Sequence, residues 1–71
     1  VEVYPNPVKD VLYLKSTSKI VLVEVFDVNG KKLISKVNTS QINLESFVKG
    51  VYLVKIKTEK GQIHQQKIIK H

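Results

Sequence analysis

The sequence predicts an all-β fold, namely a small antiparallel β-sandwich or barrel of about seven short strands. Apolar and polar residues alternate with a period of two along most of the chain, and the helical period is almost absent. Hydrophobic residues make up 42% of the chain and are mainly Val, Ile and Leu, a composition that favours strands. Gly, Pro and Asn separate the apolar segments at close spacing. With 71 residues, we expect a single domain.

The first two expected strands flank a proline-rich corner. Val1–Tyr4 is a short strand that stops at Pro5, because proline lacks the N–H that a central ladder needs. Val11–Lys15 is the second strand, with its leucines on one face and Val11 and Tyr13 on the other. Such two-sided alternation is typical of a strand in a small sheet.

The longest expected strand is Ile20–Val28. Val21, Val23 and Val25 line one of its faces, while Glu24 interrupts the other face. We therefore expect the valine face to be the buried one.

The dipeptide Asn29-Gly30 follows this strand and predicts a hairpin. Both residues readily adopt positive φ, as the two central positions of a type I′ turn require. We expect a type I′ turn here, with Lys31–Val37 as the returning strand.

A polar stretch leads to the second half of the chain. Ile42–Leu44 alternates apolar and polar residues and is expected to form a short strand. Glu45–Gly50 then forms a turn, or a single turn of helix, that Gly50 ends.

The last two expected strands form a second hairpin. Val51–Thr58 places Tyr, Val and Ile on one side and lysines on the other. Glu59–Gly61 connects it to Gln62–Lys70, with a glycine placed for a bulge. The sequence leaves the register of this hairpin open, because the adjacent isoleucines of the last strand offer an apolar side chain to both faces.

The charge is strongly positive. All 12 basic residues are lysines against 6 acidic residues, which gives a net charge of +6. This balance favours an anionic partner, or else the lysines keep a small sheet soluble and protect its edges. The absence of arginine argues against nucleic-acid readout, since arginine supplies the bidentate contact to guanine. We therefore expect no nucleic-acid partner, although a basic nucleic-acid binder remains an alternative.

The composition also argues against catalysis. The chain has no cysteine and no convergent set of metal ligands, so we expect no metal and no cofactor. His64 and His71 lack an evident carboxylate partner, and the acidic residues are scattered. No stretch reaches the roughly 20 apolar residues that cross a bilayer, so we expect no membrane-spanning segment.

Two short motifs near opposite ends of the chain are candidates for recognition. Pro5-Asn6-Pro7 is expected to form a rigid corner, whose turn the Asp10 side chain could cap. A rigid corner also suits recognition, because a partner need not order it on binding. A purely structural role for this corner is the alternative.

The second motif runs from Gly50 to the end of the chain. Gly50 is expected to supply a backbone conformation that other residues resist, and Tyr52 fits a tyrosine corner, whose hydroxyl bonds nearby backbone. Lys67 and Lys70 flank two isoleucines in a basic terminal strand. That strand is either an edge protected by charge or a segment that a partner captures.

The order of these motifs resembles a known family. Tyr4-Pro5-Asn6-Pro7 precedes Asp10–Leu14, Val25–Lys31, Ile42–Leu44, Gly50–Val54 and Lys67–Lys70. This arrangement resembles the type A C-terminal sorting domain of the type IX (Por) secretion system over essentially the whole chain. The family's motif positions correspond here to the following residues: Pro5, Asn6, Pro7, Gly50, Tyr52, Lys67 and Lys70.

The resemblance implies an Ig-like sandwich, residues 1–71, cut from the end of a larger cargo protein, and it leaves open whether that cargo is an enzyme. The domain would not be an enzyme but a signal that directs the cargo through the outer membrane. Its partners would be the type IX translocon, shuttle proteins and a sortase-like signal peptidase. The cargo would pass through the periplasm and be secreted or held at the cell surface, in some members through anionic lipopolysaccharide.

An immunoglobulin- or fibronectin-like adhesion or carbohydrate-binding module is the main alternative function. Exposed aromatic side chains would favour it. The chain has few aromatics, and several of them are expected to be buried.

Overall fold

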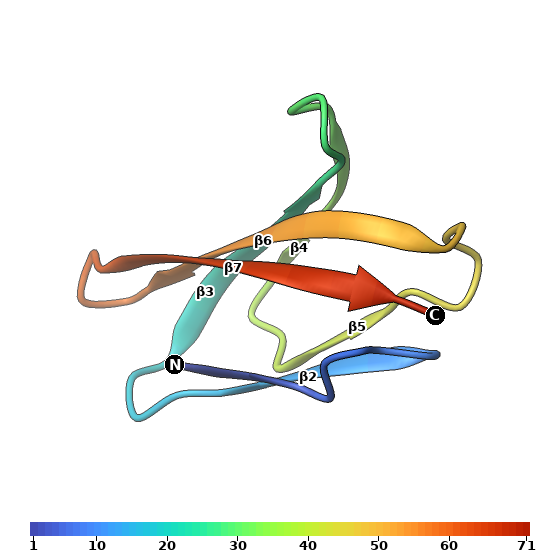
Figure 1. Cartoon of the computed structure of the whole chain (residues 1–71). Coiled ribbons are helices and arrows are strands. Elements are labelled where there is room, and N and C mark those ends of the chain that lie inside the picture. Colours follow the sequence, from blue (N-terminus) through green and yellow to red (C-terminus); the bar gives the residue numbers. More distant parts are fainter.

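The computed structural model describes residues 1–71 and contains strands but no helix (Figure 1). The strands are β1 (Glu2–Tyr4), β2 (Val11–Lys15), β3 (Ile20–Phe26), β4 (Lys32–Val37), β5 (Gln41–Asn43), β6 (Gly50–Thr58) and β7 (Ile63–Lys70). They form a three-stranded sheet in the order β1-β2-β5 and a four-stranded sheet in the order β4-β3-β6-β7. All strand pairs are antiparallel. Two separate sheets make a sandwich rather than a barrel.

The strand order is that of an immunoglobulin-like Greek key. The strands β1, β2 and β5 take the places of A, B and E, and β4, β3, β6 and β7 take those of C′, C, F and G. The predicted all-β, Ig-like sandwich is therefore confirmed.

The core lies between the two sheets. Tyr52, Val54 and Ile56 of β6 point inward, as their alternation predicts, and Leu12 and Leu14 of β2 face them from the other sheet. Twelve buried hydrophobic residues form one cluster: Val8, Leu12, Leu14, Ile20, Val23, Val25, Ile42, Leu44, Tyr52, Val54, Ile56 and Ile68.

The valine face of β3 is buried, with one exception. Val23 and Val25 have no exposed surface, whereas Val21 is only half-buried. The register of β3 against β6 shifts between Ile20 and Leu22. This irregularity turns Ile20 into the core at the start of the strand, because a bulge reverses the alternation on either side of it.

The turn between β3 and β4 is not the predicted type I′ turn. Gly30 has a φ of 83°, but Asn29 does not have a positive φ. The N–H of Gly30 donates to the carbonyl of Asp27 at 3.1 Å, and the N–H of Asp27 donates to the carbonyl of Lys31 at 2.9 Å. This is the pattern of a longer loop, in which a type I turn is followed by a glycine in the left-handed region.

The Asp27 side chain accounts for this difference. Its Oδ1 accepts hydrogen bonds from the N–H groups of Asn29 and Lys31, both at 2.9 Å. When an aspartate side chain accepts hydrogen bonds from nearby backbone N–H groups in this way, it stabilises a type I turn, in which the residues that follow have negative φ. Only Gly30 then needs positive φ.

The β6–β7 hairpin uses the same loop design, as predicted. Gly61 has a φ of 82°, and its N–H donates to the carbonyl of Thr58 at 3.0 Å. The register pairs Tyr52 with Ile68, so Ile68 is fully buried and Ile69 points outward with 44% of its surface exposed. Ile68 therefore belongs to the core, which resolves the register that the sequence left open.

Of two smaller expectations, the turn after β5 is confirmed and the Asp10 cap fails. The segment that follows β5 forms a turn, with the N–H of Phe47 bonded to the carbonyl of Leu44 at 2.9 Å, so the helical alternative is wrong. The Asp10 side chain does not cap the proline corner. Instead, the main-chain carbonyl of Asp10 accepts the N–H of Leu44 at 2.7 Å and extends the contact between β2 and β5.

Candidate recognition site

The proline corner lies against the last strand. After β1, the chain leaves the three-stranded sheet through Pro5-Asn6-Pro7 and passes alongside the end of β7 (Figure 1). The Asn6 Oδ1 accepts the N–H of Ile69 at 3.0 Å, and its Nδ2 donates to the carbonyl of Lys67 at 3.5 Å. The amide side chain of Asn6 thus offers β7 the donor and the acceptor that a neighbouring strand would offer.

Val8 completes this contact. Its N–H donates to the carbonyl of Ile69 at 2.8 Å, and its carbonyl accepts the N–H of His71 at 2.8 Å. Val8 and Lys70 form an isolated parallel bridge, and the Val8 side chain is fully buried in the core. We call the contact of Asn6 and Val8 with Lys67–His71 the terminal clamp.

Gly50 lies opposite the terminal clamp, at the start of β6. It pairs with Lys70 and has a φ of 153°, a backbone conformation that side-chain-bearing residues rarely adopt. No atom lies within 4 Å of the position that a Cβ would take. The requirement for glycine is therefore conformational rather than steric, as the sequence predicts.

Tyr52 forms the predicted tyrosine corner. Its hydroxyl donates to the carbonyl of Val48 at 2.6 Å, and only 6% of the residue is exposed. The ring packs edge-to-face against Phe47, with centroids 5.4 Å apart. These contacts attach the loop before Gly50 to the start of β6.

The two terminal lysines lie in different environments. Lys67 is exposed on the outer face of the four-stranded sheet. Lys70 is only 6% exposed, and its Nζ donates to the main-chain oxygen of His71 at 2.8 Å. Lys70 therefore stabilises the end of the chain from inside the sandwich, while Lys67 presents its charge to solvent.

The structure thus brings both sequence motifs to one end of the molecule. The corner residues Pro5, Asn6 and Pro7 contact or flank the last strand, and Gly50 and Tyr52 pair with its end. Val8 is the residue that sequence reasoning missed. A single valine between a proline and a lysine gives no periodic signal, and an isolated bridge needs no alternation.

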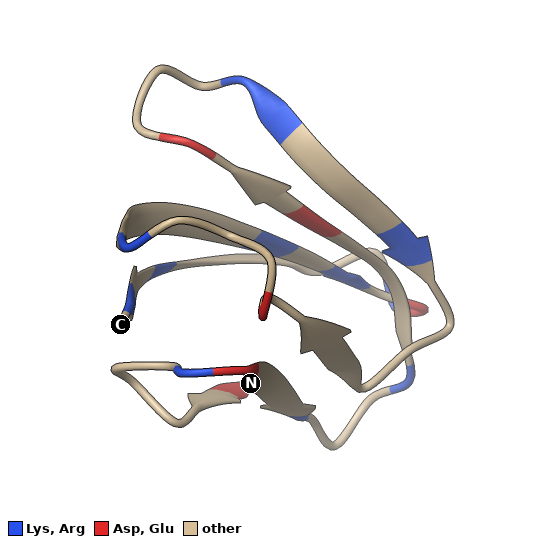
Figure 2. Ribbon diagram, turned by 90° about the vertical axis from the view of Figure 1, so that its right-hand side faces the viewer, with Lys and Arg blue, Asp and Glu red and all other residues tan.

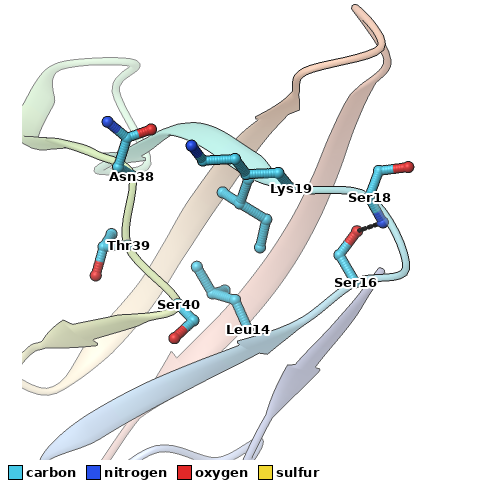
Figure 3. Close-up of a pocket in the computed structure, with 8 residues that line it drawn as sticks. Leu14, Ser16, Ser18, Lys19, Asn38, Thr39 and Ser40 are labelled. Atoms are coloured by element: carbon cyan, nitrogen blue, oxygen red, sulfur yellow. Dashed lines mark hydrogen bonds between the residues drawn. The ribbon is translucent and has the colours of Figure 1, made fainter.

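The opposite end of the sandwich carries a shallow hollow (Figure 3). Leu14 and Ile20 form its apolar floor, and Ile20 pairs with Thr58, at the far end of β6 from Gly50. The polar rim consists of Ser16, Ser18, Lys19, Asn38, Thr39 and Ser40. No candidate recognition residue lines this hollow.

No group of three or more His, Cys, Asp or Glu side chains is placed to hold a metal ion. Lysines are spread over several strands and loops rather than gathered in one place (Figure 2). The structure also contains no helix long and apolar enough to cross a membrane.

Comparison with protein families gives a match over nearly the whole chain. A family described as "Secretion system C-terminal sorting domain" matches residues 2–71, essentially the whole chain. No curated protein matches the chain.

Proposed function

The chain belongs to the family of type IX secretion system C-terminal sorting domains, and on this premise we propose that its terminal clamp and last hairpin form the address read by the translocon and its shuttle proteins. The family is a non-catalytic one whose members mark proteins for export by this system. The chain is accordingly a sorting signal for a secreted or surface-exported protein.

One observation supports the choice of this end of the molecule. The motif residues Pro5–Pro7 and Gly50–Lys70, which are far apart in the sequence, meet at the terminal clamp. The clamp holds them on rigid elements, so a receptor would lose little conformational entropy in binding them. A preorganised surface suits a sorting signal that one receptor must recognise on many different cargo proteins.

The later steps of export are part of the same proposal and rest on the family resemblance. Residues 1–71 would be the tail of a larger cargo, which crosses the periplasm before it reaches the translocon. A sortase-like signal peptidase would then remove the domain. The cargo would be released or joined to anionic lipopolysaccharide at the cell surface.

The proposal is tested by export of a reporter fused to the N-terminus of this chain. Removal of Lys67–His71 should leave the reporter in the periplasm. That truncation also removes Ile68, which is fully buried, so unfolding alone could block export. A second variant must therefore change the surface and leave the core intact.

The double variant Lys67→Glu, Ile69→Ser meets this need. Both side chains are exposed, and the hydrogen bonds of Ile69 to the clamp are made by its backbone. The matched control is Lys36→Glu, Val37→Ser on β4. It makes the same kind of change at two exposed positions on the opposite edge strand of the same sheet. We expect the first variant to strand the reporter and the control to export it. Normal export of the first variant, with its circular dichroism spectrum unchanged, would reject the proposal.

A second candidate function is carbohydrate binding. Tyr4 and Tyr13 are 46% and 42% exposed, and their rings stack with centroids 5.7 Å apart on the three-stranded sheet. Exposed aromatic rings are the feature that would favour such a module. Titration of the chain with neutral oligosaccharides, followed by NMR, tests carbohydrate binding. Chemical-shift changes at both tyrosine rings would support it if the Tyr13→Ala variant no longer responds to the sugar. The absence of shift changes in the unmodified chain would exclude it.

A further inference from the structure

The first half of β7 is an open sheet edge. β7 is the outermost strand of the four-stranded sheet. Ile69 directs its N–H and its carbonyl away from β6, to the terminal clamp. That direction recurs at every second residue of an antiparallel strand, so the backbone groups of Lys67, Gln65 and Ile63 also face outward.

These outward groups differ in whether they have partners. The terminal clamp covers Ile69 and reaches the carbonyl of Lys67. No hydrogen bond within the chain reaches the outward N–H and carbonyl groups of Gln65 and Ile63. The clamp therefore closes one half of the edge and leaves the other half unpaired.

The other sheet edges are protected. β1 and β5 are each 3 residues long, which is too short to pair strongly with another chain. The opposite edge, β4, has an irregular register beside Val25 and Phe26 and exposes Lys32 and Lys36. The stretch Ile63–Lys67 has neither a bulge nor a proline, so it is suited to accept a further strand.

Side chains beside this edge indicate the chemistry of that strand. Lys67 is exposed on the outer face, and the register places Lys55 and Lys57 of β6 next to Gln65 and Ile63. Ile63 itself is 56% exposed. The edge thus combines an apolar side chain with three nearby lysines.

No acidic side chain on this hairpin offsets those lysines between Gly50 and Thr58 or along β7. Glu59 lies in the loop of this hairpin, and Glu24 of neighbouring β3 pairs with Lys55 in the register and forms an ion pair with Lys32 at 3.0 Å. Lysines therefore outnumber acidic side chains beside this edge, and the local charge is positive. An acidic partner would be attracted to it, and a basic one would be repelled.

We propose that an extended segment of a partner protein, alternating acidic and apolar side chains, adds as a strand to β7 along Ile63–Lys67. This inference rests on the proposed function for the partner's identity, since the partner would belong to the export apparatus. Main-chain hydrogen bonds would supply affinity, and the lysines would select the acidic sequence. A second copy of this chain fits less well, because it would bring another set of lysines to the same edge.

A capped peptide with the sequence Thr-Glu-Val-Glu-Val-Glu-Thr is a suitable probe. It is titrated into the ¹⁵N-labelled 71-residue chain at low salt, and amide shifts are followed by NMR. We expect the largest shifts at Ile63, Gln65 and Lys67, and none from a peptide with Lys in place of Glu. Equal shifts at lysines over the whole surface would overturn the proposal. So would concentration-dependent shifts of these amides without peptide, since they would assign the edge to a second copy.

Two variants make this test specific. Gln65→Pro removes an outward N–H and leaves the β6 ladder intact, and Gln65→Thr is the control that keeps the N–H. We expect Gln65→Pro to weaken peptide binding about tenfold or more and Gln65→Thr to retain it. If Gln65→Pro does not fold, Lys67→Glu serves instead. This variant should bind the acidic peptide more weakly and the basic peptide more tightly than the unmodified chain does. Unchanged binding by a folded variant would overturn the proposal.

The reporter fusion separates this inference from the proposed function. If the unmodified chain does not export the reporter, the proposed function is wrong, whatever the peptide does. If the chain exports it and the folded Gln65→Pro fusion is exported equally well, the sorting function stands and strand addition at β7 is wrong.

Discussion

At the scale of single residues, Asn6 has the most consequential position in the chain. Its amide side chain bonds to the backbone of Ile69 and Lys67 across 63 and 61 residues of sequence. The proline on each side limits the backbone and aims that amide at β7. One exposed side chain thereby takes the place of a neighbouring strand.

This role predicts a local effect of Asn6→Ala. The change should leave the Ile69 N–H without its partner and destabilise the domain by about 1 kcal/mol. Hydrogen exchange at Ile69 should then accelerate roughly tenfold or more, which exceeds the roughly fivefold increase that a loss of about 1 kcal/mol gives to core amides of β6 that exchange through global unfolding. The matched control is Asn43→Ala, because Asn43 Oδ1 accepts only the nearby N–H of Glu45, at 2.9 Å. Equal protection of Ile69 in both variants would show that the Asn6 bond contributes nothing.

At the scale of elements, the two hairpins show how far local sequence decides structure. Both loops end with a glycine in the left-handed region, Gly30 at 83° and Gly61 at 82°. The second loop was predicted correctly because its glycine follows two residues that are poor strand formers. For the first loop, Asn29-Gly30 predicts the shorter type I′ turn, but the two hydrogen bonds that Asp27 Oδ1 accepts from the backbone favour the longer loop.

Substitutions in the first loop distinguish the two turn types. A type I′ turn would make Asn29→Ala costly, since Asn29 would have to adopt positive φ. In the observed loop only Gly30 has positive φ. We therefore expect Gly30→Ala to lower the free energy of unfolding by about 1 kcal/mol and Asn29→Ala to change it by less than about 0.5 kcal/mol. Urea denaturation measures both, and the reverse order would restore the type I′ assignment.

Alternation predicts most of the strands and their buried faces, because it reports how each strand sits between the core and water. It groups Leu12 with Leu14 and Val54 with Ile56 on single faces, and both faces are buried. It does not predict the terminal clamp, which depends on one side chain and an isolated bridge between distant parts of the chain. Nor does it separate Lys67 from Lys70, since a lysine gives the same signal whether it is exposed or turned inward.

At the scale of the whole molecule, the two sheets depend on Val8 as well as on face-to-face packing. Val8 comes from the connection between β1 and β2, yet it bridges to β7 of the other sheet and is fully buried. A domain of this size buries a modest fraction of its surface, so each fully buried residue has a large share in stability.

We therefore expect Val8→Ala to cost about 2 kcal/mol, which would lower the melting temperature by roughly 10 °C. Val48→Ala is the matched control, since Val48 is 77% exposed and should change the melting temperature little. Differential scanning calorimetry measures both variants. Equal melting temperatures would mean that the buried Val8 side chain contributes little to holding the sheets together.

The parallel direction of the Val8–Lys70 bridge has a mechanical consequence. The two ends of the chain lie on opposite sides of the molecule (Figure 1). Tension applied between them would slide residues 6–8 and 69–71 past each other along their common axis. The hydrogen bonds joining these segments would then have to rupture together rather than open one after another. A domain built in this way resists being unravelled from its ends for as long as those bonds hold.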